Sequence, residues 1–356
     1  MRNIPPITGA DVWHGKDMAR SPRWQRRLTP AQLAEIDGAL AAARARRLDW
    51  EAMIAEDLPL PGLATLMNDI REELEDGSGL LMLRGLDPAR YTLDELKIVY
   101  AGFCRQLGTL VFSNRGGEIM REIRDVGRYV GQRYGELSDG QGAAFLSSYS
   151  RTLSNQGLRY HTDRCDVVAL LCIRQAMKGG VSKLCSSPAV HSAMLARRPE
   201  LCAALYEDVW RSRFGEEDEG DSLGYPLPVW GQRNGKFTSH YSRTFVEAGQ
   251  RRPEAPRVSP AQWEALDLLS DLADEFSFEM IFTPGDIQFV NNHVIYHART
   301  AFEDEAESGH DRMLLRLWLA MPNSRALPEG HEVLWRSIEA GALRGGIGQT
   351  ASAPLR

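Results

Sequence analysis

The clearest hydrophobic pattern in the chain lies between residues 312 and 321. One set of alternate positions is wholly apolar and comprises Met313, Leu315, Leu317, Leu319 and Met321. A period of two predicts a strand with one buried face. The other face carries Arg312 and Arg316, about 13 Å apart at the rise of a strand. These arginines require anions, either from a bound carboxylate or from an Asp or Glu on a neighbouring strand, and the pattern favours neither source.

The first part of the chain is predominantly helical. Apolar spacing and capping residues predict helices over about 30–40, 63–76 and 92–107, the last opening with the capping box Thr92-Leu93-Asp94-Glu95. The run Leu80–Gly85 is short, apolar and bounded by glycine, which predicts the first buried strand.

From about residue 110 the pattern changes to short apolar runs separated by Gly, Asn and Asp, which is typical of a sandwich or barrel. Strands are expected over 166–174 and 181–186, and helices are expected to start at Ser187-Pro188, near Pro199 and at Ser259-Pro260. The acidic run 216–221 is interpreted as a solvated loop. The fold class is therefore mainly β with flanking helices.

Composition excludes several classes of protein. The chain has 356 residues, of which 43% are hydrophobic and 25% charged, with a net charge of −6. No basic surface for nucleic acid is expected, and no apolar run is long enough for a membrane span. The N-terminus lacks the apolar core of a secretory signal, and 5 cysteines without metal-type spacing are expected to be reduced thiols of a cytoplasmic protein.

His161 and Asp163 are the first candidates for metal chemistry. Residues two apart point to the same face of an extended strand, so both could reach one ion. A third ligand is expected from either His293 or His297, but not both, because four extended residues span about 13 Å. Two imidazoles and one carboxylate leave coordination positions open, as in non-haem Fe(II) oxygenases.

A larger set of motifs resembles the taurine dioxygenase-like family of Fe(II)- and 2-oxoglutarate-dependent oxygenases. The resemblance covers about residues 80–325 and rests on motifs in the family's order and rough spacing: His161-x-Asp163, Gly179-Gly180-Val181-Ser182, Pro284-Gly285-Asp286, Asn291-Asn292 through His297-x-Arg299, and Arg312-x-x-x-Arg316.

The resemblance implies a role for each matching residue. His161, Asp163 and His297 match the iron ligands, which selects His297 over His293. Arg312 matches the arginine that binds the distal carboxylate of 2-oxoglutarate. Ser182 lies where the family commonly has a threonine hydroxyl on the same carboxylate. The implied fold is a double-stranded β-helix, a jelly roll whose open end holds the metal.

The implied reaction uses Fe(II), 2-oxoglutarate and O2 to hydroxylate an unactivated C–H, releasing succinate and CO2. The same oxidant could instead desaturate the substrate or close a ring. Asp163 argues against halogenation, since related halogenases carry a small non-ligating residue there.

The substrate is expected to be a small molecule with a carboxylate, such as an amino acid. Arg316 matches a family position that contacts the substrate anion in members acting on acidic substrates. Further contacts are expected from His240, Tyr241, Arg243, Tyr225 and Trp230. The segment Tyr225-Pro226-Leu227-Pro228 is expected to form a rigid, extended piece of a lid.

Three regions are expected: a helical extension over 1–78, the oxygenase domain over 79–325, and a C-terminal tail over 326–356. The extension would cover one end of the barrel or form the interface of a homo-oligomer.

Two other classes of protein fit these residues less well. A metal-free jelly-roll binding module leaves the arginine strand unexplained, and a zinc hydrolase has no need of an arginine for a cosubstrate.

Overall fold

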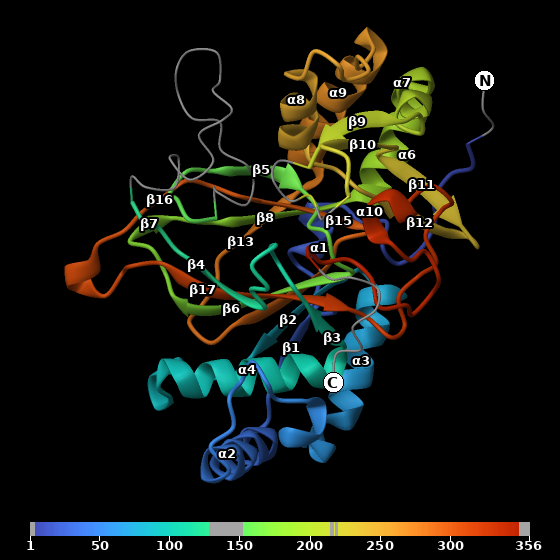
Figure 1. The fold of residues 1–356 in the computed structure, drawn as a ribbon. Coiled ribbons are helices and arrows are strands. Elements are labelled where there is room, and N and C mark those ends of the chain that lie inside the picture. The colour runs from blue at the N-terminus through green and yellow to red at the C-terminus, as the bar shows by residue number, and fades with distance from the viewer. Residues whose placement is uncertain (1–3, 128–151, 214–216, 218–219, 349–356) are drawn as a thin grey trace.

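The computed structural model describes residues 4–127, 152–213, 217 and 220–348. Within these residues the chain forms two β-sheets that face each other, with helices on both outer sides (Figure 1). The predicted acidic loop 216–221 falls largely outside the described residues.

The larger sheet has seven strands in the order β1-β2-β14-β6-β17-β3, with β4 also paired to β17. Its strands are β1 (Gln25–Arg27), β2 (Leu80–Arg84), β3 (Thr109–Val111), β4 (Met120–Ile123), β6 (Val167–Arg174), β14 (Ile287–Asn291) and β17 (Met313–Ala320). β1 and β2 are parallel, whereas the other pairs are antiparallel.

The smaller sheet has four antiparallel strands in the order β13-β8-β15-β5. These strands are β5 (Leu158–His161), β8 (Ser182–Ser186), β13 (Phe278–Met280) and β15 (Ile295–Arg299). Three two-stranded ribbons complete the β structure: β7 (Lys178–Gly179) with β16 (Phe302–Glu303), β9 (Val209–Ser212) with β10 (Gly224–Leu227), and β11 (Trp230–Arg233) with β12 (Lys236–Ser239).

Helices cover the outer face of each sheet (Figure 1). On the larger sheet lie α2 (Pro30–Ala45), α3 (Ala64–Glu75) and α4 (Leu93–Leu107); on the smaller sheet lie α6 (Ser187–Arg197), α7 (Pro199–Ala204) and α9 (Pro260–Phe276). The other helices in the described part of the chain are α1 (Gly15–Met18), α8 (Arg243–Gln250) and α10 (Glu332–Trp335), and short 3-10 turns lie there at Ala55–Asp57, Pro61–Leu63, Pro88–Arg90 and Ala306–Ser308.

The alternation along β17 explains how the layers are held together. Leu315, Leu317 and Leu319 pack with α4 in the core between the larger sheet and its helices. Leu314 and Trp318 point the other way, into the core between the two sheets. The alternation confirms the predicted strand, but both of its faces are buried, whereas the period of two predicted only one buried face.

Most predicted helices and strands are present, with small shifts at their ends. Capping boxes at Thr29, Thr92 and Ser259 start α2, α4 and α9. The helix expected at Ser187-Pro188 is capped one residue earlier, by the Ser186 hydroxyl, which accepts from the Ala189 amide.

The segment predicted as a rigid lid forms a buried strand. Residues 224–227 pair with β9, and Tyr225 and Leu227 are buried in a cluster with Leu334 and Trp335. Residues from the region 326–356, predicted as a tail, therefore pack against the body of the protein.

Candidate metal centre and adjoining cavity

His161, Asp163 and His297 converge at one end of the smaller sheet. One potential ligand atom from each lies within 4.8 Å of the others, and among the described residues this is the group of His, Cys, Asp and Glu that could hold a metal ion. The ring centroids of His161 and His297 are 4.2 Å apart. Nε2 of His161 lies 3.8 Å from Oδ1 of Asp163.

Strand pairing positions the two histidines. His161 is the last residue of β5, and it lies directly opposite His297 of β15 in the antiparallel register. Side chains at directly opposed positions project from the same face of a sheet. The sheet thereby places two imidazoles together although they are far apart in the sequence.

Backbone contacts hold Asp163 beside this pair. Its amide donates to Oδ1 of Asn292 at 2.9 Å, in the turn between β14 and β15. The preceding residue, Thr162, donates its amide to the carbonyl of Tyr241 at 2.8 Å. The carboxylate is thus fixed by contacts with two other segments.

The carboxylate of Asp163 also has two side-chain partners. Nε1 of Trp318 donates to Oδ2 at 2.9 Å, and Nη1 of Arg316 lies 3.5 Å from the same oxygen. Oδ1 faces the histidines. Partners of this kind orient a metal ligand and tune its basicity.

Protonation suits metal binding at this site. Burial lowers the pKa of His161, and burial together with His161 and Arg316 lowers the pKa of His297 to about 3. Burial alone would raise the pKa of Asp163, but Arg316 and the two histidines outweigh it and lower that pKa. Two neutral imidazoles and an ionised carboxylate are the forms that bind a metal.

The tautomer of His161 follows from its surroundings. Nδ1 lies 2.8 Å from the carbonyl oxygen of Arg159, so this nitrogen carries the proton and donates. Nε2 then presents its lone pair towards Asp163. In His297, by contrast, Nδ1 is buried without a hydrogen-bond partner among the described residues.

Arg312 is a buried guanidinium at the start of β17. Its Nε and Nη1 have no hydrogen-bond partner in the described part of the chain, and burial lowers its pKa to about 10, which still leaves it charged at neutral pH. Gly180 makes room for it, since a Cβ there would lie 2.9 Å from Nε. These unpaired donors fit a carboxylate of a bound molecule.

Ser182 begins β8, where it pairs with Arg299 of β15 and is largely buried. It follows Gly180, the glycine that leaves room for Arg312, by two residues in the chain.

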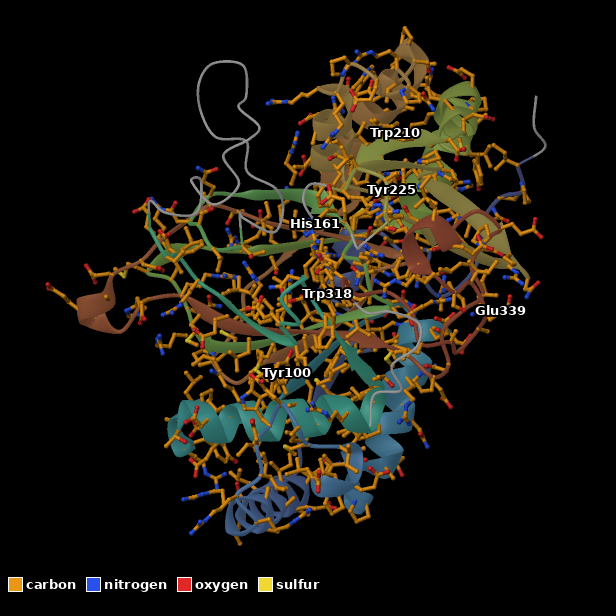
Figure 2. All side chains as sticks on the ribbon, in the orientation of Figure 1. Tyr100, His161, Trp210, Tyr225, Trp318 and Glu339 are labelled. Atoms are coloured by element: carbon orange, nitrogen blue, oxygen red, sulfur yellow. The ribbon has the colours of Figure 1, made fainter. Side chains whose placement is uncertain are left out.

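A cavity adjoins the candidate ligands. It is lined by Thr152, His161, Thr162, Asp163, Arg164, Ser212, Arg213, Tyr225, His240, Phe245, Arg316, Trp318 and Leu334. In Figure 2, Tyr225 and His161 lie close together, and Trp318, from the larger sheet, lies below them. Three of the predicted substrate contacts, Arg316, His240 and Tyr225, are in this wall.

The other predicted contacts lie elsewhere. Arg243 forms ion pairs with Glu247 and Asp267 on the helical side of the molecule. Tyr241 is buried against Tyr296, and the indole of Trp230 donates to the hydroxyl of that same tyrosine at 2.9 Å. Local sequence did not show which side of their strands and turns these residues occupy.

Three contributors to the site were not singled out from the sequence: Arg164, Arg213 and Trp318. Asn292, which accepts from the Asp163 amide, belongs to a motif that was singled out. Two of the three did carry a signal. Arg164 adjoins His161-x-Asp163, and Trp318 lies on the same strand face as Arg316.

Known proteins match this chain over most of its length. Residues 45–318 match the family described as taurine catabolism dioxygenase TauD, TfdA family. The chain belongs to this family. The family match begins at residue 45, whereas the resemblance based on motifs covers only about residues 80–325.

Two relatives extend the family assignment. FR-33289 synthase from Streptomyces rubellomurinus is 32% identical, over 91% of this chain and 93% of its own. A taurine hydroxylase-like protein from Stachybotrys chartarum is 31% identical, over 86% of this chain and 77% of its own.

Solved structures share the fold at low identity. Asparagine oxygenase with Fe(II), hydroxyasparagine and succinate has a TM-score of 0.62 at 17% identity, covering 83% of this chain and 93% of its own. The non-heme iron oxygenase OrfP with Fe and α-ketoglutaric acid has a TM-score of 0.59 at 17% identity, with the same coverage.

The TauD/TfdA assignment confirms the expected double-stranded β-helix and makes the chain an Fe(II)/2-oxoglutarate-dependent dioxygenase. The family assignment therefore takes precedence over the two alternatives, a metal-free binding module and a zinc hydrolase. No helix among the described residues is long and apolar enough to cross a membrane.

Proposed function

We propose that this TauD-family enzyme hydroxylates an unactivated C–H of a small, anionic, amino-acid-like molecule. The observation that carries the proposal is the convergence of His161, Asp163 and His297, whose potential ligand atoms lie within 4.8 Å. With Fe(II) and 2-oxoglutarate bound, the site would supply oxidation by O2, with succinate and CO2 as by-products.

In this proposal each residue near the metal has a defined task. His161, Asp163 and His297 hold the ion. Trp318 and Arg316 keep the Asp163 carboxylate ionised and oriented, because one donates to Oδ2 and the other lowers the pKa of the group. The hydrogen bond from His161 to the Arg159 carbonyl fixes the imidazole tautomer.

Arg312 and Ser182 are proposed to bind 2-oxoglutarate. Two buried, unsatisfied N–H groups on Arg312 can donate to its distal carboxylate, and the missing side chain of Gly180 leaves the guanidinium room. Such charge-assisted bonds contribute about 1.5–3 kcal/mol each. The Ser182 hydroxyl would add a further donor.

Two observations support an amino-acid-like substrate. The cavity wall carries the arginines Arg164, Arg213 and Arg316, which suit an anion, and its volume lies beside the proposed metal ligands. Structures of the same fold were solved with hydroxyasparagine and with hydroxyarginine.

The five cysteines are free and buried, which suits a reducing compartment, so we propose that the enzyme works in the cytoplasm.

The test is anaerobic addition of Fe(II) and then 2-oxoglutarate, with the weak visible charge-transfer band of the chelate as the readout. Wild-type protein should show the band. Arg312→Ala should need a 2-oxoglutarate concentration about tenfold higher or more to give the same band, because the charge-assisted hydrogen bonds of the guanidinium are lost. Arg174→Ala, which breaks an exposed ion pair with Asp311, serves as the control. Absence of the band in wild-type protein would contradict the proposal.

A further inference from the structure

The cavity beside the candidate metal centre is lined by unequal numbers of acidic and basic side chains. Among its described lining residues, Arg164, Arg213 and Arg316 carry positive charge, whereas Asp163 alone is acidic. His240 adds no charge, because its pKa is held well below its usual value. Burial is the main cause, and the positive charge of Arg211 is the second. The wall is therefore suited to an anion.

Arg316 contacts the proposed metal ligand Asp163 through one nitrogen, while its Nε and Nη2 are buried without a hydrogen-bond partner among the described residues. Its Nη1 lies 3.5 Å from Asp163, and its guanidinium lies over the indole of Trp318 at 4.7 Å from the ring centroid. It also has the largest effect among the groups that lower the pKa of Asp163. A substrate that relied on Nη1 of Arg316 would compete with this carboxylate.

Arg213 lies on a different part of the wall and is held rigidly. Its Nε donates to the carbonyl of Ser222 at 3.1 Å, and Nη2 donates to the carbonyl of Val333 at 2.7 Å. The guanidinium lies 4.8 Å from the ring centroid of Tyr225. An arginine fixed in this way loses little conformational entropy when it binds a ligand.

The third nitrogen of Arg213 remains available. Nη1 is buried without a hydrogen bond in the part of the chain that the structure describes, and Asp221 approaches it only to 3.6 Å. Asp221 is also about one-third exposed, so water weakens this ion pair. A buried N–H of this kind is a donor for a bound anion.

Arg164 belongs to the same part of the wall, although it follows Asp163 in the chain. Its charge acts on His240, whose Nε2 lies 3.5 Å from the hydroxyl of Tyr225. Tyr225 in turn lies against Arg213. The side chains Arg164, His240, Tyr225 and Arg213 all line this cavity.

We propose that Arg164 and Arg213 form an anion subsite that binds the acidic head group of the substrate, while Arg316 serves the metal ligand Asp163. The inference rests on the proposed function, because it assumes that the cavity receives the substrate. The ligand class is an oxyanion, either a carboxylate or a tetrahedral group such as a sulfonate, sulfate or phosphate. Two guanidiniums offer paired donors to either kind.

The test is calorimetric titration of the anaerobic complex with Fe(II) and 2-oxoglutarate, using acetate and sulfate as separate probes. At least one probe should bind the wild-type complex and bind Arg164→Gln and Arg213→Gln about tenfold or more weakly. Stronger acetate binding would identify a carboxylate head group, and stronger sulfate binding a tetrahedral one. The visible band of each variant shows separately that metal and cosubstrate are bound.

Arg233→Gln is the matched control, because Arg233 also donates to two backbone carbonyls, those of Leu327 and Ile338, but does not line the cavity. It should bind the probe like wild type. The subsite is wrong if wild type binds neither probe while showing the band. It is equally wrong if Arg213→Gln binds as wild type does, or if only Arg316→Gln loses binding. A missing band in wild type would instead refute the proposed function.

Discussion

Two buried His–Asp pairs lie near each other in this protein, and they differ in how fully their polar atoms are satisfied. His161 and Asp163 are 3.8 Å apart at the candidate metal centre, whereas His293 and Asp166 form a hydrogen bond of 2.8 Å. The first pair lies within one segment, at the end of β5 and just after it, whereas the second joins the segment after β5 to the turn between β14 and β15.

The His293–Asp166 pair is completed by protein groups. Nε of Arg344 donates to Oδ1 of Asp166 at 2.8 Å, and the amide of Met321 donates to Oδ2 at 2.9 Å. The other nitrogen of His293 lies 2.9 Å from the hydroxyl of Thr238. No ligand is needed to satisfy these atoms.

The pair at the metal centre remains incomplete without a ligand. Oδ1 of Asp163 and Nε2 of His161 face each other beyond hydrogen-bond distance, and His297 adds a third potential ligand atom. Buried polar groups are normally paired, so unpaired ones that converge indicate a function. Residue type alone does not distinguish the two pairs, whereas their partners do.

The largest expected effect follows from removing a proposed ligand. His297→Gln should abolish the visible Fe(II)–2-oxoglutarate band and lower turnover by more than about 100-fold, beyond what loss of an outer partner causes. His191→Gln is the control, because His191 is also buried but bonds to Tyr206 away from the centre. A band retained by His297→Gln would contradict the ligand assignment.

Breaking the satisfied pair should instead affect stability. Arg344→Met leaves Asp166 buried beside His293 without its cation and should lower the free energy of unfolding by about 3–5 kcal/mol. Urea unfolding of the metal-free protein measures this.

Arg174→Met provides the comparison, since its pair with Asp311 is exposed and should contribute at most about 1 kcal/mol. Equal effects of the two substitutions would mean that the Asp166 network is no more important than a surface ion pair.

Removing a partner of the proposed metal ligand Asp163 should have an intermediate effect. Trp318→Phe removes the donor to Oδ2 of Asp163 and should weaken Fe(II) binding about 10- to 100-fold. Trp24→Phe removes a comparable buried indole bond, to the carbonyl of Met18, without touching the centre, and should leave Fe(II) affinity unchanged. Both affinities can be measured by anaerobic titration.

Acidification should reveal the smallest effect. Burial lowers the pKa of His293 from 6.5 to about 4, with Asp166 only partly opposing it. Between these values the unfolded chain binds a proton that the folded protein does not, so stability falls as the pH drops through this window.

The contribution of His293 between pH 7 and 5.5 is about 1 kcal/mol, because most of the titration in this range occurs in the unfolded state. His293→Gln should therefore lose about 1 kcal/mol less stability than wild type over the same range, measured by urea unfolding. An unchanged pH dependence would show that His293 has the same pKa in the folded protein as in the unfolded chain.

The sequence predicted those parts of the fold that local patterns determine. The alternation over 313–321 predicted β17 and its apolar face, though not the burial of the face that carries Arg316, and capping residues marked the start of α2, α4 and α9. His161 and Asp163 could be proposed from their spacing, because both lie on or beside one strand.

The choice between His293 and His297 could not be made from spacing alone. A turn at residues 292–294 separates β14 from β15, and the two strands belong to different sheets. The network around Asp166 was equally inaccessible, since its partner Arg344 lies 178 residues away in the chain. Such contacts depend on tertiary packing, which periodicity does not encode.

The direct opposition of His161 and His297 has a consequence for folding. Displacing β15 by one residue along β5 would turn His297 to the opposite face of the sheet, because strand side chains alternate. An ion held by both histidines would therefore stabilise the native register and no slipped one. Bound iron would thus favour the native strand register during refolding. The metal-free chain lacks this contribution to the choice of register.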